Sequence, residues 1–246
     1  MVWDTATGER IHTLRDKSET MMALQDLAID PEDSTDAEIV LVSSSSDPHI
    51  RRWRLSLDSA SQIMDTAEAS ASSDKPVRGT ILEHETSVYK VLFAGDDESP
   101  DLWTASADGT AKCLSRCRQW STEEKYEQGD YVRAVAVTGD WAVTAGRNED
   151  VKVWNRATGK LHHIYDGHYE EVTGLVLLKG GTNVVSVSID RTVRVWGLTK
   201  IELEKAQKEK AENPNLLQAE KVELEKSLLT EEEEAELADL MDSDDE

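Results

Sequence analysis

The chain has 246 residues, of which 38% are hydrophobic, and a formal net charge of −23. This length is ample for a hydrophobic core, and the negative charge argues against nucleic acid or an anionic membrane as the main partner. The sequence holds no apolar run of 18 residues and no signal-like segment at its start, which predicts an intracellular protein of the cytoplasm or nucleus. The two cysteines fit that reducing environment and lack a second Cys/His pair at metal-binding spacing, so we expect neither a metal nor another cofactor.

The chain opens with two short strand patterns separated by a Gly-containing turn, over residues 1–14. The first pattern ends in Trp3-Asp4. The same order of residues recurs later, where Trp154-Asn155 precedes a Thr-Gly turn and the strand pattern that ends at Ile164. We therefore interpret the opening as the end of a repeat unit whose first strands would lie upstream.

The second unit spans residues 21–54. It contains three strand patterns rich in aliphatic residues, the last of which closes on Trp53. A long polar stretch with six Ser follows it. We interpret residues 55–76 as a loop insertion rather than a linker, because strand patterns resume directly after it.

The third unit spans residues 84–116, and the fourth spans residues 131–157. An Asp108-Gly109-Thr110 sequence in the third unit predicts a tight turn between two strands. Leu114 stands in this unit where the others close on Trp. In the fourth unit, Gln128 and Asn148 occupy the positions of His84 and Asp108 in the third.

The last unit, residues 167–198, shows the pattern most fully. Gly167-His168 opens it, three strand patterns follow, and Trp196 closes it. With Ser186, Ser188 and Asp190 between them, these residues resemble the WD-repeat unit of β-propellers. Closing residues fall at positions 3, 53, 114, 154 and 196, which fits a period of about 40–45 residues once two loop insertions are allowed for.

The resemblance covers residues 1–198 and implies an all-β WD-repeat propeller of about four repeats plus the opening remnant. In this family a His, a hydroxyl, the turn Asp and the Trp form a hydrogen-bonded chain that holds the strands of a blade together. A buried polar group left unpaired is costly, so these residues occur as a satisfied set. The residues that the resemblance assigns to this structural network are His84, Ser106, Asp108, His168, Ser186, Ser188, Asp190, Trp196, Ser45, Asp47, Trp53 and Trp154.

The number of units predicts an incomplete ring. Complete propellers close four to eight blades, and here the last unit lacks its own outer strand. We expect the C-terminal part of a larger, N-terminally truncated propeller. Because an open series of sheets exposes an edge and an apolar face, we expect the chain alone to be poorly soluble or only partly cooperative in unfolding.

No catalytic motif is visible in the sequence. A Gly-rich phosphate loop, a nucleophile elbow and a His/Glu metal helix are all missing. Ser186, Asp190 and His168 match a Ser/His/Asp triad in residue type, but Trp196 completes the WD pattern and favours the structural network. We therefore expect no enzymatic activity and no small-molecule substrate.

Protein binding is the function that the resemblance implies. WD-repeat propellers bind partners at their narrower face, which carries the residues three and five after the His and the residue before the turn Asp. These positions hold Ala23, Gln25, Ser46, Ser87, Tyr89, Ala107, Tyr131, Arg133, Arg147, Glu171, Thr173 and Ile189. Tyr and Arg are enriched at binding hot spots. We hypothesise that an acidic or phosphorylated partner segment docks on Tyr89, Tyr131, Arg133 and Arg147; the alternative is that these are ordinary exposed residues.

Residues 199–246 form an acidic tail, with 17 acidic residues against 6 Lys. Strong helix formers predict helices over residues 200–212 and 216–229, interrupted by Asn213-Pro214-Asn215. A capping box beginning at Thr230 predicts one more helix.

The end of the tail offers a second candidate binding motif. Leu237, Leu240 and Met241 share one face of the last predicted helix, which favours docking to a basic groove on a partner. The alternative is a solvated, partly disordered tail. Ser243 resembles a site for an acidophilic kinase of the casein kinase two type.

The sequence thus favours a non-catalytic protein–protein interaction scaffold of an intracellular complex. One alternative is a substrate-recognition or non-catalytic subunit of an enzyme complex, such as a ubiquitin ligase or an RNA-modifying complex. Another is a chaperone whose acidic tail shields basic clients. The two alternatives differ in whether binding depends on the propeller face or on the tail.

Overall fold

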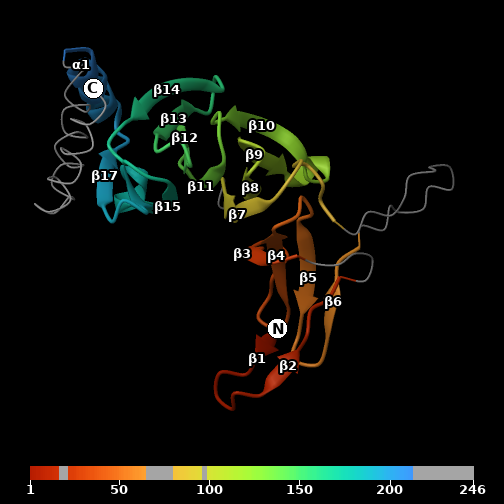
Figure 1. Ribbon diagram of the computed structural model, residues 1–246. Helices are drawn as coiled ribbons and strands as arrows, with labels where there is room; N and C mark the ends of the chain where they lie inside the picture. The colour runs from red at the N-terminus through yellow and green to blue at the C-terminus, as the bar shows by residue number, and fades with distance from the viewer. Residues whose placement is uncertain (17–21, 65–79, 96–98, 213–246) are drawn as a thin grey trace, which may run out of the picture. The chain divides into compact units, whose positions relative to one another are not determined.

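The computed structural model describes residues 1–16, 22–64, 80–95 and 99–212, and these are mostly β-strand. The chain divides into two units, Met1–Leu198 and Thr199–Glu246. The described strands lie in the first unit, and the described part of the second is helix α1 (Lys200–Glu212) (Figure 1). The predicted all-β fold class and the predicted helix over residues 200–212 are confirmed.

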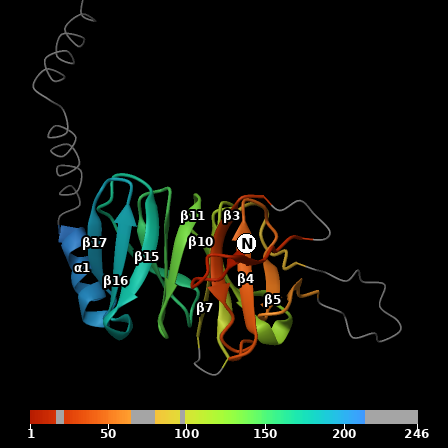
Figure 2. The ribbon, with the colours of Figure 1, turned by 90° about the horizontal axis from the view of Figure 1, so that it is seen from below.

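The first unit is a series of antiparallel sheets that follow one another in chain order (Figures 1 and 2). Among the described residues, a two-stranded piece opens the series, three four-stranded sheets follow and a three-stranded sheet ends it. Within each sheet, every strand pairs with the one that follows it in the sequence, so these connections are local hairpins. The strands are β1 Val2–Trp3 and β2 Arg10–His12; β3 Leu24–Ile29, β4 Ile39–Ser45, β5 Arg51–Leu55 and β6 Ala60–Gln62; β7 Val88–Ala94, β8 Asp101–Ser106, β9 Thr110–Ser115 and β10 Ser121–Glu127; β11 Val132–Val137, β12 Trp141–Gly146, β13 Val151–Asn155 and β14 Lys160–Tyr165; and β15 Val172–Leu178, β16 Asn183–Ser188 and β17 Val193–Gly197.

The predicted loop over residues 55–76 needs a correction. β6 pairs antiparallel with β5, with Trp53 opposite Gln62 and Leu55 opposite Ala60, and it completes the β3–β6 sheet. The prediction was wrong here because a strand of three small or polar residues within a Ser-rich stretch carries no apolar alternation.

Tight turns join the second and third strands of the three later sheets. Their left-handed residues are Gly109 (φ 83°), Glu149 (φ 66°) and Arg191 (φ 67°). Each donates its backbone N–H to the carbonyl three residues earlier, at 3.3 Å in all three turns. Only the first turn uses the glycine that this conformation favours, so the other two depend on the surrounding hydrogen bonds to hold it.

The core lies between successive sheets. Trp103 of the β7–β10 sheet stacks on Tyr126, whose ring in turn meets Trp154 of the β11–β14 sheet at 5.5 Å between centroids. Aromatic pairs of this kind contribute about 0.5–1.5 kcal/mol beyond the area that they bury. The same cluster continues with Ala105, Ala111, Cys113, Val132, Val135, Val137 and Ala142.

Trp120 packs in the same buried cluster as Leu114, the residue that stands where the other sheets have a closing Trp. Leu114 is fully buried there, and Trp120 comes from the turn before β10. Both Gln119 (φ 55°) and Trp120 (φ 63°) have left-handed backbones. The bond from Trp120 N–H to the Ser115 carbonyl, at 2.9 Å, holds this turn closed.

Arg116 links the β7–β10 sheet to the turn between β3 and β4. Its guanidinium contacts Asp30 at 2.5 Å, Glu32 at 2.8 Å and Asp33 at 3.2 Å. It also lies over the Trp120 ring, with Cζ 4.7 Å from the centroid. Asp30 is fully buried, so this arginine supplies the charge that its carboxylate needs.

Helix α1 begins with a capping box. Thr199 Oγ1 accepts the backbone N–H of Glu202 at 3.3 Å, and the Glu202 carboxylate accepts the Thr199 hydroxyl at 2.5 Å. No helix within the described residues is long and apolar enough to cross a membrane. The predicted helices over residues 216–229 and after Thr230 lie outside the described residues.

Candidate partner-binding face

A β-bulge occurs at the same place in the first strand of each of the four larger sheets. The pairing register shifts between Leu24 and Asp26, Val88 and Lys90, Val132 and Ala134, and Val172 and Gly174. A bulge leaves one residue out of the ladder and re-aims its side chain. The four bulge residues are Gln25, Tyr89, Arg133 and Thr173, which the sequence analysis placed on the binding face.

A backbone hydrogen bond that recurs in all four sheets joins the other two predicted residues of each set. In each sheet the residue before the turn Asp or Asn donates its N–H to the carbonyl of the residue two before the bulge. These bonds run from Ser46 to Ala23, Ala107 to Ser87, Arg147 to Tyr131 and Ile189 to Glu171, at 2.8–3.0 Å. The four predicted sets of residues therefore occupy equivalent positions, including those in the units that lack a His.

Arg133 brings three successive sheets into contact at this face. Its guanidinium carbon lies 4.2 Å from the centroid of the Tyr89 ring, on the preceding sheet. Its Nε forms an ion pair with Glu171 Oε1 at 2.8 Å, just before the first strand of the following sheet. A guanidinium that lies over an aromatic ring and forms an ion pair at one edge is restricted in its orientation.

Arg147 and Tyr131 form a second pair beside the first. Arg147 Cζ lies 5.4 Å from the centroid of the Tyr131 ring, and Tyr131 is 42% exposed. Arg147 is exposed and makes no ion pair with any residue in the described ranges. Tyr89, Tyr131, Arg133 and Arg147, hereafter the Tyr–Arg cluster, thus lie on neighbouring sheets; among the described residues Arg133 has an ion pair and Arg147 has none.

Below this face, the last sheet contains the hydrogen-bonded chain that the resemblance implies. Trp196 Nε1 donates to Ser186 Oγ at 2.8 Å, and Ser186 Oγ lies 2.6 Å from His168 Nε2. His168 Nδ1 lies 2.8 Å from Asp190 Oδ2. Because the carboxylate is an acceptor only, Nδ1 carries the proton, and the Ser186 hydroxyl donates to Nε2.

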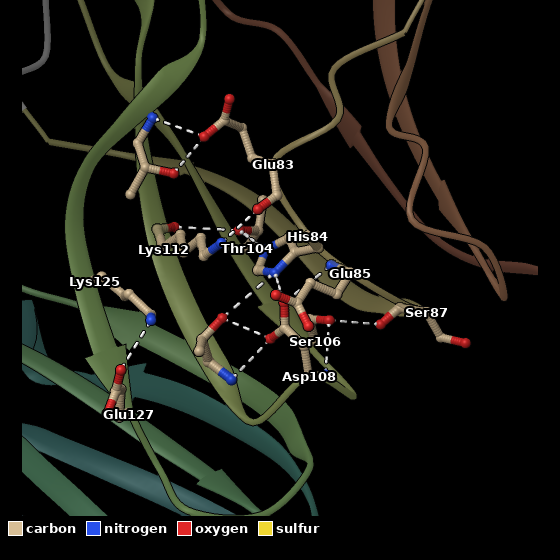
Figure 3. Close-up of polar contacts among 12 residues, drawn as sticks. Glu83, His84, Glu85, Ser87, Thr104, Ser106, Asp108, Lys112, Lys125 and Glu127 are labelled. Atoms are coloured by element: carbon tan, nitrogen blue, oxygen red, sulfur yellow. Dashed lines mark hydrogen bonds and ion pairs between the residues drawn. The ribbon is translucent and has the colours of Figure 1, made fainter.

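The β7–β10 sheet repeats the hydroxyl, His and Asp of this chain, with Thr104 as the hydroxyl and with Leu114 where the other sheets have the Trp donor (Figure 3). His84 Nδ1 lies 2.8 Å from Asp108 Oδ2, and its Nε2 lies 2.7 Å from Thr104 Oγ1. Ser106, which the sequence analysis assigned to the network, instead bonds the Ser87 carbonyl and the Asp108 N–H. In the last sheet Ser188 bonds the Glu170 carbonyl and the Asp190 N–H, so these two serines fix the turn rather than contact the His.

In the β11–β14 sheet an amide pair replaces the His–Asp pair. Trp154 Nε1 donates to Thr144 Oγ1 at 2.7 Å, and Thr144 donates to Gln128 Oε1 at 2.6 Å. Gln128 Nε2 then donates to Asn148 Oδ1 at 2.8 Å. Glutamine presents an acceptor and a donor in the places of the imidazole Nε2 and Nδ1–H, so the direction of the whole chain is preserved.

In the β3–β6 sheet a buried arginine takes the central place. Trp53 Nε1 donates to Ser43 at 2.8 Å. Arg51 Nη1 donates to Ser45 at 3.1 Å and to the turn residue Asp47 at 3.0 Å, and its Nε donates to Asp16 at 2.5 Å. Sequence reasoning placed Gln128 and Asn148 at the positions of His84 and Asp108 but left them, with Ser43 and Thr104, out of the network that it assigned, and it missed Arg51 and Thr144. Their fixed offsets from the closing residue were the signal that could have identified them.

The electrostatics of the turn carboxylates follow from these bonds. Burial by itself raises the pKa of Asp108, but the hydrogen bonds from His84 and Thr110 outweigh it and hold this pKa well below its ordinary value. Asp190 behaves in the same way, with bonds from Thr192 and His168 opposing the effect of burial on its pKa. Both turn carboxylates are therefore charged acceptors at neutral pH.

The triad-like residues are not arranged for nucleophilic chemistry. Ser186 is fully buried and its hydroxyl accepts from Trp196, so an external substrate has no access to it. Cys113 is buried in the core, and burial raises the pKa of its thiol far above the ordinary value, which makes it a poor nucleophile. Within the described residues, no group of three or more His, Cys, Asp and Glu could hold a metal ion. Leu237, Leu240, Met241 and Ser243 lie outside the described residues.

Comparison with known proteins adds independent evidence. The family described as "WD domain, G-beta repeat" matches residues 159–197. An uncharacterized WD repeat-containing protein of Schizosaccharomyces pombe is 31% identical over 80% of this chain and 59% of its own length. Periodic tryptophan protein 2 of Arabidopsis thaliana is 31% identical over 48% of this chain and 13% of its own. The chain thus spans only part of the length of these relatives.

A solved structure resembles the fold. The computationally designed Ika4 protein covers 78% of this chain with its whole length, at a TM-score of 0.54 and 21% identity. Such a likeness concerns the fold alone. Together with the repeated sheets and their hydrogen-bonded chains, these matches support a WD-repeat protein, and the four-stranded antiparallel sheets of its first unit are consistent with β-propeller blades.

Proposed function

We propose that this chain is a non-catalytic scaffold of an intracellular protein complex and that the Tyr–Arg cluster is its partner-binding site. Its WD-repeat relatives support a protein-interaction scaffold in general. The observation that carries the specific site is the repeated bulge, which in four successive sheets directs one side chain out of the ladder. At two of these four positions the side chain is a Tyr or an Arg, the residue types that dominate binding energy at interfaces.

The contacts of the cluster favour binding over a purely structural role. Tyr131 and Arg147 remain exposed although their ring and guanidinium meet. A stacked pair has already lost much of its side-chain freedom, so a partner that docks on it gives up less entropy on binding. The cluster is therefore a preorganised anchor on a rigid sheet scaffold.

The test is affinity capture from cell extract with the Arg133→Ala/Arg147→Ala double variant. We expect this variant to lose the proteins that wild type captures, while circular dichroism and the unfolding midpoint stay unchanged. The matched control is Arg54→Ala/Arg118→Ala, which removes two exposed arginines from β5 and from the turn before β10. Equal capture by wild type and the Arg133/Arg147 variant would show that the site is wrong.

The acidic tail is proposed as a separate contact for a basic partner. Its support is its charge alone, 17 acidic residues against 6 Lys. Deletion of residues 230–246 should remove the proteins whose capture falls steeply with salt, and it should leave those that depend on the Tyr–Arg cluster. If deletion removed all partners, the chaperone alternative would replace the scaffold.

A further inference from the structure

Arg133 already holds one carboxylate. Its Nε is 2.8 Å from Glu171 Oε1, and the two side chains are 33% and 26% exposed. The ion pair with Glu171 is made at the Nε edge of the guanidinium, and the Tyr89 ring lies against one of its faces. Nη1 and Nη2 make no hydrogen bond or ion pair within the described ranges 1–16, 22–64, 80–95 and 99–212. Glu171 therefore shows that a carboxylate fits against this arginine. The Nη1 and Nη2 groups remain as donors for a second carboxylate.

Arg147 supplies a second guanidinium on the same β11–β14 sheet as Arg133. It directly precedes the turn residue Asn148, and its backbone bonds Tyr131, which lies two residues before Arg133. It has no ion pair among the described residues and is exposed. The two arginines thus differ in state, since one is partly neutralised by Glu171 and the other is not.

We propose that the Tyr–Arg cluster selects a protein segment by an Asp or Glu side chain, and that Glu171 competes with this carboxylate for Arg133. This proposal rests on the proposed function of the cluster. A carboxylate accepts two parallel bonds from a guanidinium, and the fork of Arg133 offers that pair of donors. The net charge of −23 repels strongly acidic segments, so the segment carries one or two carboxylates among neutral residues.

Glu171 then acts as a specificity-determining residue, because it lowers the affinity of Arg133 for the carboxylate of a ligand. A ligand must exchange its own carboxylate for that of Glu171 or share the guanidinium with it, and in both cases the existing charge opposes binding. Removal of the Glu171 charge should consequently strengthen the binding of acidic ligands. A residue that only braced the face would give the opposite result, because its loss would loosen Arg133.

The experiment uses the full chain as bait for a phage-displayed random 12-residue peptide library. The most enriched peptide is then synthesised with a fluorophore, together with a version in which Asp and Glu are replaced by Asn and Gln. Affinities are measured by fluorescence anisotropy for wild type, Glu171→Gln, Glu170→Gln and Arg133→Ala. Glu170→Gln is the matched control because it removes the same charge from the neighbouring exposed residue, whose side chain makes no described contact with Arg133.

We expect enrichment of Asp or Glu in the selected peptides. Glu171→Gln should tighten binding about 2–5-fold, the range of an exposed ion pair, and Glu170→Gln should change it less. Arg133→Ala should weaken it about tenfold or more, and the amide version of the peptide should not respond to Glu171→Gln.

The outcomes separate this proposal from the one on which it rests. Peptides that need Arg133 but show no acidic enrichment, or equal effects of Glu171→Gln and Glu170→Gln, would overturn the proposed role of Glu171 and leave the binding site standing. Failure to select any peptide that depends on the cluster would contradict both. If phosphoserine in place of the selected acidic residue bound tenfold more tightly, the ligand group would be a phosphate and the assignment to Asp or Glu would be wrong.

Discussion

Gln128 and Asn148, joined at 2.8 Å, occupy in the β11–β14 sheet the places that His84 and Asp108, also joined at 2.8 Å, occupy in the β7–β10 sheet. The amide pair carries no net charge, whereas the other pair contains a carboxylate. Both pairs nevertheless hold the same turn, and in both a hydroxyl from the second strand forms a hydrogen bond to the pair. The repeat therefore conserves the direction of the hydrogen bonds more strictly than the residues that make them.

Gln128→Ala should destabilise the chain by about 1–3 kcal/mol, because the buried Thr144 hydroxyl loses its acceptor and Asn148 Oδ1 loses its donor. Urea denaturation followed by tryptophan fluorescence measures this change. Gln128→His and Asn148→Asp should each destabilise, and the double variant should recover about 0.5–3 kcal/mol relative to their sum. Simple additivity of the two substitutions would show that the pair is not coupled.

The turn carboxylates predict a loss of stability in acid. Hydrogen bonds lower the pKa of Asp108 and Asp190 below the value of about 3.9 that is expected in the unfolded chain. Folding then favours the charged forms, so their contribution is complete above about pH 4 and declines as the pH falls toward the lower folded pKa. The Asp108→Asn/Asp190→Asn variant should be less stable than wild type at pH 6, and its stability should fall less steeply from pH 5 to pH 2.5.

Urea midpoints across this pH range measure the two slopes. The control is Asp36→Asn/Asp58→Asn, which changes two exposed carboxylates and should reproduce the slope of wild type. Parallel curves for wild type and the Asp108/Asp190 variant would contradict the assignment of acid sensitivity to the turns.

The strands and their order could be predicted from the sequence because each sheet repeats a local pattern. Aliphatic runs, an Asp-Gly turn and a closing Trp report on residues a few positions apart, and they place most strands of the first unit. The hydrogen-bonded chain through His168 could be predicted equally well, since its members lie at fixed offsets from Trp196. Local pairing within a hairpin is the part of the fold that sequence spacing describes well.

Contacts between sheets could not be predicted in this way. The pairing of Arg133 with Glu171 depends on a bulge that turns one side chain across to the next sheet. Trp120 packs in the core cluster that contains Leu114, and the turn that carries it there has a left-handed backbone. Both arrangements depend on the packing of segments that are distant in sequence, which a pattern of residue types does not record.

The contact of Arg116 with the β3–β4 turn predicts a strong dependence on a single side chain. Arg116→Ala should destabilise by about 3–5 kcal/mol, because it leaves the buried Asp30 carboxylate without its cation. Arg118→Ala removes a neighbouring arginine with one exposed partner at 3.6 Å and should cost less than about 1 kcal/mol. If both variants had the same urea midpoint, Arg116 would not stabilise the junction between these sheets. Asp30→Ala/Arg116→Ala should lose less than the sum of the two single variants.

The outer face of β17 predicts self-association of the chain. Val193 and Val195 are 66% and 60% exposed, whereas Val151 and Val153, at the same distances from the closing Trp of the preceding sheet, are fully buried. Val→Thr keeps the β-branched shape and adds a hydroxyl. Val193→Thr/Val195→Thr should therefore leave the free energy of unfolding unchanged within about 0.5 kcal/mol and reduce concentration-dependent light scattering. Val151→Thr/Val153→Thr should instead cost about 1–3 kcal/mol for each buried hydroxyl. Equal destabilisation by the two pairs would show that the β17 face is covered in the folded chain. Any self-association of wild type would then occur through another surface.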